Sequence, residues 1–460
     1  MRLQPLLVIL PLSIIVSSTL IAQTQRAEPY DSLAHQVVKE ALGSNKAYEM
    51  LSDLCTNIGH RLSGSPAAAK AVQWAEKRMA ELRFDNVHLE PVMVPHWVRG
   101  PVERAYVLDA SGGREDLAVT ALGGTIGTPP GGITAEVLEV KSFEELHKLS
   151  EKAKGKIIFF NRPIDRTVIN TFEAYGGAVD QRGAGAVEAA KVGGIAALVR
   201  SMTTRRDNVP HTGAMHYDDS VKKVPAAAVS IIGAERLSAL LAAGKPVLVH
   251  MEFSAQTLPD VESANVVGEL RGSEKPEEVI VIGGHLDSWD KGQGANDDGA
   301  GCVQSIEAVR LLKVLGLKPR RTIRAVMFMN EENGLRGGIA YAEKNRPGEK
   351  TVAAIESDMG SFMPIGFGIS DSAAYEKLAR WAPLFRFINA DHFQLGGGGA
   401  DISPLARHGV PLLDLIPEVQ QYFDYHHSDN DTIESVNERE LALGAAALAI
   451  LSYIIAQEGL

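Results

Sequence analysis

Three short apolar runs, each followed at once by acidic or histidine residues, constrain the fold of this chain more than any other feature. The runs span residues 279–283, 322–329 and 351–355 and are rich in valine, isoleucine, alanine and methionine. Such continuous apolar runs are typical of parallel strands that are buried on both faces of a sheet. In an open α/β sheet, ligands bind outside the carboxyl ends of the strands, so clusters that are distant in sequence can meet in one crevice. The sequence therefore predicts an α/β fold with a polar site at that edge of the sheet.

Five polar clusters follow these runs or follow turns. They are His285-Leu286-Asp287, Asn296-Asp297-Asp298-Gly299, Asn330-Glu331-Glu332, Glu356-Ser357-Asp358 and His426-His427. Imidazole nitrogens and carboxylate oxygens together suit zinc, whereas an all-oxygen set would favour magnesium or calcium. A zinc-bound imidazole usually donates its other ring N–H to a carboxylate, so Asp287 is expected to orient His285. The five clusters together predict a hydrolase with two metal ions.

Within each pair of adjacent carboxylates, Asp297-Asp298 and Glu331-Glu332, the two members are expected to have different roles. Asp297 lies between glycines that let the backbone come close to metal ions, and its carboxylate can bridge two cations. Asp298 is expected to cap the helix that follows. Of the adjacent Glu331 and Glu332, one can bind an ion while the other takes a proton as general base.

The length of 460 residues predicts two domains rather than one core. Residues 102–249 carry glycine-rich turns between short apolar strands and contain none of the five clusters, whereas strands with clusters appear from about 263. We therefore expect an inserted domain at 102–249, which interrupts a catalytic domain made of residues 28–101 and 250–460.

The net charge of −11 argues against a nucleic-acid partner, which would require a basic face. Residues 1–22 read as a signal peptide, which predicts a secreted or periplasmic protein without stable membrane contact after cleavage. An uncleaved anchor is the alternative. The apolar segment 441–456 is too short, and too interrupted by Gly444, Ser452 and Tyr453, for the span of a bilayer, so we expect a packed helix capped by Asn437. Cys55 and Cys302 are expected to be free, buried thiols.

The order His-x-Asp, Asn-Asp-x-Gly, Asn-Glu-Glu, Glu-Ser-Asp and His-x-x-x-Asp-Thr resembles the di-zinc exopeptidases. This family includes bacterial co-catalytic zinc aminopeptidases and glutamate carboxypeptidases. The resemblance covers the chain after the signal peptide. It implies a mixed, mostly parallel sheet with helices on both faces, interrupted by a protease-associated domain at 102–249.

The same resemblance assigns the metal ligands. It places His285 and Asp358 on one Zn²⁺ ion. It places Glu332 and His427 on a second Zn²⁺ ion, with Asp297 between the two.

Further roles follow from the resemblance. Glu331 becomes the general base, and Asp287 the residue that orients His285. His426 stands where many relatives have a tyrosine that stabilises the oxyanion, and an imidazole can donate the same hydrogen bond.

The implied function is hydrolysis of dipeptides or short peptides with free termini by a metal-bridging hydroxide. A homodimer is left open. Two alternatives remain on the same fold. One is a non-catalytic, receptor-like binding protein, and the other is a one-zinc enzyme of the glutaminyl cyclase type.

Overall fold

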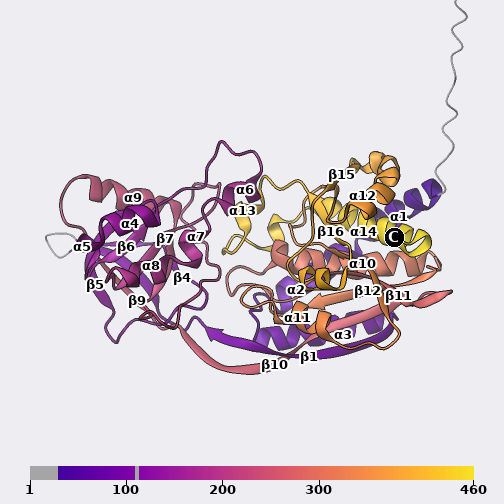
Figure 1. The fold of residues 1–460 in the computed structure, drawn as a ribbon, viewed down its shortest axis with the longest axis horizontal. Coiled ribbons are helices and arrows are strands. Elements are labelled where there is room, and N and C mark those ends of the chain that lie inside the picture. The colour runs from indigo at the N-terminus through magenta and orange to yellow at the C-terminus, as the bar shows by residue number, and fades with distance from the viewer. Residues whose placement is uncertain (1–29, 109–112) are drawn as a thin grey trace, which may run out of the picture.

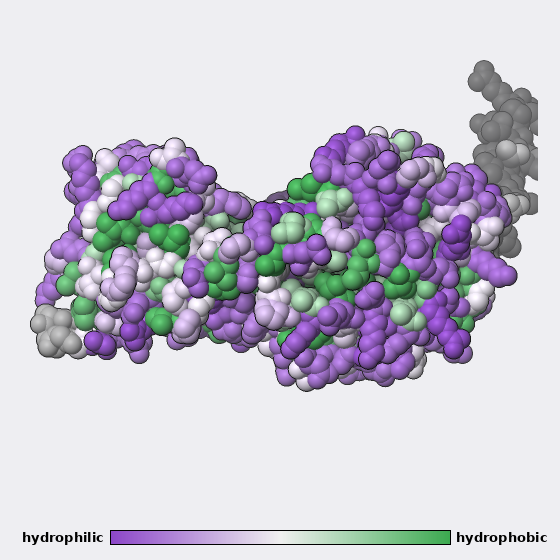
Figure 2. Space-filling view, turned by 90° about the horizontal axis from the view of Figure 1, so that it is seen from below, coloured by the Kyte–Doolittle hydropathy of each residue, from purple (hydrophilic) through white to green (hydrophobic). Residues whose placement is uncertain are grey.

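The computed structural model describes residues 30–108 and 113–460, so the predicted signal peptide at 1–22 lies outside the described residues. Within these residues the strands form two eight-stranded sheets, and both are mixed. The two sheets with their helices occupy opposite ends of an elongated molecule (Figure 1). Seen from below, the two parts meet over a narrower waist (Figure 2).

The first sheet has the strand order β1-β10-β12-β11-β13-β16-β14-β15. Its central strands β12, β11, β13 and β16 are parallel neighbours, whereas β1, β10 and β14 pair antiparallel. The predicted mixed sheet with a parallel centre is thus confirmed. The strands span Asp85–Val98 (β1), Gln256–Leu270 (β10), Lys275–His285 (β11), Arg321–Phe328 (β12), Lys350–Glu356 (β13), Pro364–Ile369 (β14), His392–Leu395 (β15) and Leu412–Pro417 (β16).

Helices cover both faces of this sheet. Along β11, Ile280 and Ile282 face a large core with α10 and α14, whereas Val279 and Val281 face a smaller core with α11. The helices span Asp31–Ser44 (α1), Lys46–Asn57 (α2), Pro66–Glu81 (α3), Ala300–Val314 (α10), Arg336–Glu343 (α11), Ser372–Leu378 (α12), Tyr422–Tyr425 (α13) and Glu438–Glu458 (α14). Helix α10 joins the parallel strands β11 and β12 and so forms the crossover of a βαβ unit.

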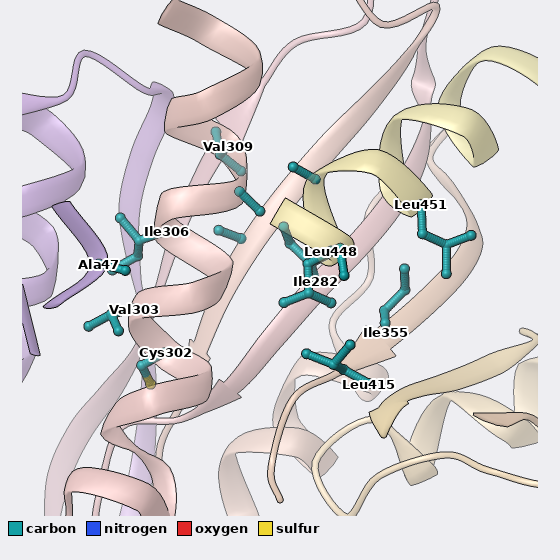
Figure 3. Close-up of a cluster of buried hydrophobic side chains, with 14 of the residues drawn as sticks. Ala47, Ile282, Cys302, Val303, Ile306, Val309, Ile355, Leu415, Leu448 and Leu451 are labelled. Atoms are coloured by element: carbon teal, nitrogen blue, oxygen red, sulfur yellow. The ribbon is translucent and has the colours of Figure 1, made fainter. Parts of the chain in front are cut away.

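The larger core contains both cysteines. Figure 3 shows Cys302, Val303 and Ile306 of α10 lying between α2 and the sheet, with Leu448 and Leu451 of α14 beyond Ile282. Cys55 and Cys302 are both free and buried, as predicted.

The second sheet is formed by the strands between Glu103 and Phe253, in the order β3-β2-β9-β5-β6-β7-β8-β4. These strands span Glu103–Leu108 (β2), Arg114–Leu117 (β3), Val119–Ala121 (β4), Ile133–Val140 (β5), Ile157–Phe160 (β6), Ala196–Arg200 (β7), Ala226–Val229 (β8) and Leu248–Phe253 (β9). Its helices span Phe143–Lys148 (α4), Ser150–Ala153 (α5), Thr171–Gly176 (α6), Asp180–Gly183 (α7), Gly185–Lys191 (α8) and Ile231–Ala242 (α9).

The two parts of the molecule contact each other at several places, and two of these can be followed in Figure 1. The antiparallel strands β1 and β10 run from the first sheet to the second along one side of the molecule, and on the other side α6 lies beside α13 (Figure 1). There, Phe172 of α6 stacks on Tyr422 of α13 with ring centroids 5.1 Å apart, and Thr171 donates a hydrogen bond to the carbonyl of Val419. The second sheet therefore reaches the carboxyl edge of the first through α6.

Helix α14 lies inside the first part of the molecule. Among the described residues it is the one helix long and apolar enough to cross a membrane by length and composition, and 89% of its most apolar window is buried. The predicted packed helix is confirmed, and the Asn437 side chain accepts hydrogen bonds from the N–H groups of Arg439 and Glu440. The argument that the segment is too short was wrong, because the helix has 21 residues and about 20 suffice to span a bilayer.

Candidate metal centre

Strand ends and the turns that follow them bring the predicted residues together. His285 is the last residue of β11, Glu332 follows β12, and Asp358 follows β13. Asp297 lies in the turn Ala295–Gly299 before α10, and His427 follows α13. In that turn the Asp298 carboxylate accepts a hydrogen bond from the Gly301 N–H at 2.9 Å, in the first turn of α10, although the N-cap residue of the helix is Gly299 and not Asp298.

The first donor set consists of His285, Asp297 and Asp358. His285 Nε2 lies 3.2 Å from Asp297 Oδ1 and 3.4 Å from Asp358 Oδ1. The other ring nitrogen, Nδ1, lies 2.9 Å from the backbone oxygen of Asp287, so Nε2 is the nitrogen that faces the carboxylates. Three ligand atoms therefore converge on one point, which is the arrangement that a zinc site needs.

The second donor set consists of Asp297, Glu332 and His427. His427 Nε2 lies 3.3 Å from Asp297 Oδ2 and 3.1 Å from Glu332 Oε2. Asp297 thus presents one oxygen to each set. The Glu332 carboxylate is held from behind, because the backbone N–H of Trp289 donates to its Oε1 at 3.0 Å.

Among the described residues, several buried polar atoms of this centre have no hydrogen-bond partner, as expected of atoms that bind a cation. His285 Nε2, Asp297 Oδ2 and Asp358 Oδ1 are buried and, among the described residues, make no hydrogen bond. Burying unpaired polar atoms is costly unless they are paired or bind a metal. Nitrogen and oxygen donors in this combination fit zinc.

His426 offers a competing way to complete the second donor set. Its Nε2 lies 3.8 Å from Asp297 Oδ2, and its ring stacks on that of His427 with centroids 3.4 Å apart. The ligand atoms of Asp297, His426 and His427 all lie within 4.8 Å of one another. We favour Glu332 over His426 as the third member, because the contact between Glu332 and His427 is shorter.

Two carboxylates near the donor sets have different surroundings. Burial raises the pKa of the Glu331 carboxyl well above its ordinary value; His285 opposes this rise, whereas the charges of Asp358 and Glu332 add to it. The Asp287 carboxylate accepts hydrogen bonds from the backbone N–H groups of Asn330 at 2.7 Å and Glu331 at 3.2 Å. Its Oδ1 is 3.9 Å from His285 Nδ1, so the main chain of Asp287 orients the His285 ring while its carboxylate supports the Glu331 turn.

Burial and charge affect the three histidines and the shared aspartate. Burial lowers the pKa of His426 well below its ordinary value and also lowers that of His427. Burial alone would lower the pKa of His285, but the neighbouring Asp358 and Asp297 bring it well above its ordinary value. Burial alone would raise the pKa of Asp297, but the neighbouring His285 and His427 rings bring it well below its ordinary value. Asp297 is therefore an anion between the imidazoles of the two donor sets, and a bound metal would require those imidazoles to be neutral.

A cavity of about 240 Å³ opens beside the two donor sets. Glu331, His426 and ligands of both sets line one side. Side chains that the sequence analysis did not assign to the site line the rest, namely Phe172, Tyr175, Arg182, Ala214, Tyr422 and Phe423. Four of these six come from residues 102–249, which carry no metal-ligand cluster and gave no signal of a functional role.

Arg182 is the lone arginine or lysine among the cavity residues. Its guanidinium carbon lies over the Tyr175 ring, 5.5 Å from the centroid, and its Nε donates to the carbonyl of Ala214. Nη1 lies 3.4 Å from His427 Nδ1. Arg182 is 9% exposed, and none of the ion pairs found among the described residues includes it. A buried guanidinium without a carboxylate partner favours an anionic ligand.

Comparisons with known proteins agree with this geometry. Residues 265–452 match the family model described as peptidase family M28. The chain is 39% identical to carboxypeptidase Q of Mus musculus, over 93% of this chain and 90% of that protein. It is also similar to the crystal structure of a peptidase M28 precursor from Shewanella amazonensis SB2B, with a TM-score of 0.88 and 34% identity over 93% of this chain and 97% of that one. BSAP, a zinc aminopeptidase from Bacillus subtilis, shares the fold, with a TM-score of 0.64 and 20% identity over 90% and 94% of the two chains. The resemblance predicted from the motifs is confirmed.

Proposed function

The chain belongs to peptidase family M28, and we propose that it is an exported, zinc-dependent exopeptidase that cleaves dipeptides or short peptides with free termini. The observation that carries the proposal is the pair of donor sets that share Asp297 beside the unligated carboxylate of Glu331. The names of the similar proteins support a peptidase, and one of them is a zinc aminopeptidase.

Two zinc ions would be held by the residues of the two donor sets. Zinc bound there would polarise the scissile carbonyl and lower the pKa of the attacking water. Two sets with Asp297 in common favour two ions over the single ion of a cyclase. Retention of all five ligands argues against a receptor-like protein that has lost catalysis.

Glu331 is the general base in this proposal. It lines the cavity, and its backbone is held by Asp287 rather than by a donor set. Burial raises the pKa of the Glu331 carboxyl well above its ordinary value, so it is a stronger base than an ordinary glutamate and can take a proton from water and return it to the leaving amine.

Arg182 binds the free carboxylate of the substrate. The guanidinium lines the same cavity as the acidic groups, with Nη1 3.4 Å from His427 Nδ1, so it can hold the carboxyl end while the scissile bond faces Glu331. A cavity of about 240 Å³ leaves room for a small peptide only. A dipeptide has both ends free, so its cleavage fits an aminopeptidase and a carboxypeptidase equally well.

His426 stabilises the oxyanion by donating one ring N–H. The ring lines the cavity, and Tyr175, Tyr422 and Phe423 pack around it at centroid distances of 5.1–5.3 Å. Burial keeps the ring neutral, and a neutral imidazole still has one N–H to donate.

The remaining parts of the proposal concern organisation and export. We assign residues 102–249 as the protease-associated domain, because their strands form a sheet of their own and their helices reach the cavity. Export by the segment 1–22 is tested by sequencing the amino terminus of the mature protein recovered outside the cytoplasm.

Product analysis on a panel of dipeptides tests the activity. Each dipeptide is supplied with free ends, with an acetylated amino end and with an amidated carboxyl end. We expect cleavage of the free dipeptide, slow cleavage of the amide, and about two zinc ions by elemental analysis. Activity that survives removal of all metal by a chelator would contradict the proposal, and so would full activity with one tightly bound ion.

A further inference from the structure

A short strap from the second sheet holds the turn that carries the histidine pair. The strap consists of residues 211–213, in the loop between β7 and β8. His211 Nδ1 donates to the carbonyl oxygen of His426 at 2.7 Å, and the backbone N–H of Thr212 donates to the carbonyl oxygen of His427 at 2.8 Å. Both carbonyls of the histidine pair are therefore bound by the strap.

His427 needs such external support because of its backbone conformation. Its φ of 60° lies in the left-handed region, which residues other than glycine adopt rarely and keep only where surrounding contacts enforce it. Helix α13 bonds the residues on either side of His427, because the His426 N–H donates to the Tyr422 carbonyl and the Ser428 N–H donates to the Tyr425 carbonyl. The direction of the His427 ring thus depends on contacts from outside its own segment.

The strap is itself fixed to the second sheet. The backbone N–H of His211 donates to Ser201 Oγ at 2.9 Å. Ser201 Oγ in turn donates to the carbonyl of Val229, the last residue of β8, at 2.8 Å. Gly213 passes so close to the site that a Cβ there would lie 2.7 Å from His427 Nδ1. A continuous set of hydrogen bonds therefore links β8 to the histidine pair.

The chemistry of His211 suits a fixed donor. The side chain is 3% exposed and belongs to neither donor set. Burial lowers its pKa to about 4, so the ring is neutral near pH 7. Since a carbonyl oxygen can only accept, the single ring proton is on Nδ1, and Nε2 has no hydrogen-bond partner among the described residues.

We propose that His211 is a positioning residue for the second donor set. Its Nδ1–H holds the His426 carbonyl and so directs His427 Nε2 toward Asp297 and Glu332. This inference rests on the proposed two-zinc function. The metal affinity of the second donor set would then depend on the second sheet, which also supplies part of the cavity wall.

The test compares His211→Leu with His211→Asn. Asparagine places Nδ2 where histidine has Nδ1 and keeps the donor, whereas leucine fills the space without one. Metal-free protein is titrated with Zn²⁺ by calorimetry, and kcat and KM are measured separately on a dipeptide. We expect His211→Leu to weaken one of the two zinc ions by on the order of 10- to 100-fold and to lower kcat more than it changes KM, because partners that orient a ligand have effects of this size. His211→Asn should stay close to wild type.

His216→Leu is the matched control, since His216 lies in the same loop with an exposed side chain. It should bind two zinc ions normally. Wild-type zinc affinity and kcat in His211→Leu would overturn the inference, and so would an equal loss in His211→Asn, which would show that ring packing matters rather than the donated bond.

A second variant covers the case in which His211→Leu does not fold. Ser201→Ala removes the acceptor of the His211 N–H but leaves the imidazole in place, so we expect a smaller loss of affinity for the same zinc ion. Unchanged zinc binding in that variant would then overturn the inference. Failure of the wild-type protein to bind zinc or cleave dipeptides would instead refute the proposed function itself.

Discussion

Acid should destabilise the folded protein through His211, and His211→Asn should remove this effect. In the folded chain the imidazole is buried, and burial lowers its pKa to about 4 against an ordinary value of 6.5. Asp207 favours protonation, whereas His427 and Arg205 oppose it. Asparagine keeps the hydrogen bond to His426 but has no group that titrates in this range.

The direction and size follow from proton linkage. Between pH 6.5 and about 4 the unfolded chain binds a proton that the folded chain does not, so the free energy of unfolding rises with pH in this window. The contribution of His211 is complete above pH 6.5 and is lost as the pH falls toward 4. Linkage gives a loss of about 2 kcal/mol at pH 5 and about 3 kcal/mol in total.

Urea unfolding at pH 7.5 and pH 5, followed by tryptophan fluorescence, measures this loss. A chelator is present throughout, so that acid release of metal does not differ between the variants. Other titrating groups are common to both proteins and cancel in the comparison. We expect wild type to lose about 2 kcal/mol more than His211→Asn between the two pH values. Equal losses would show that the ring titrates normally and is not held neutral by burial.

Four further outcomes are expected. Glu331→Gln should bind zinc normally and lose on the order of 10²-fold in kcat, measured with zinc content on the same sample; normal turnover would refute its role as base. Arg182→Gln should lower kcat/KM by about 30-fold or more for a free dipeptide and far less for its amide, since a buried charged hydrogen bond is worth about 2 kcal/mol or more; equal losses would refute carboxylate binding. His426→Ala should keep both zinc ions and lose on the order of 10²-fold in turnover, part of which His426→Tyr recovers; near-normal turnover in the alanine variant would show that other donors hold the oxyanion. Chelation should lower the Tm, because the carboxylates of the donor sets repel one another without cations; an unchanged Tm would argue against their convergence.

The sequence predicted the parts of the fold that depend on local pattern. The apolar runs of β11, β12 and β13 are buried on both faces, so hydrophobicity alone identifies them. After the inserted domain, the strands of the catalytic domain were expected from about 263, yet β10 begins at Gln256. Its first eight residues are exposed or half-buried and therefore carry little hydrophobic signal.

The contributions of Arg182 and His211 were not predictable from local pattern. Each reaches the site from a segment without metal-ligand motifs, and the approach is made by packing of α6 on α13 and by the strap. The role expected for the Asp287 carboxylate also needed coordinates, because a main-chain oxygen two residues along from His285 competes for the same ring nitrogen. Spacing in a sequence does not distinguish the side-chain oxygen from the main-chain oxygen.

Because β1 pairs with β10, the second sheet and its helices form a unit that can be exchanged as one segment of the chain. Val98, at the end of β1, lies opposite Gln256, at the start of β10, so the two ends of the 99–255 excursion are adjacent. This is a hairpin opened at its tip, and folded units can be inserted or exchanged at such tips without altering strand register. Gene shuffling between relatives could therefore replace 99–255 as one cassette. The graft would replace Arg182 and His211 together, so substrate choice and metal affinity would change in a single recombination event.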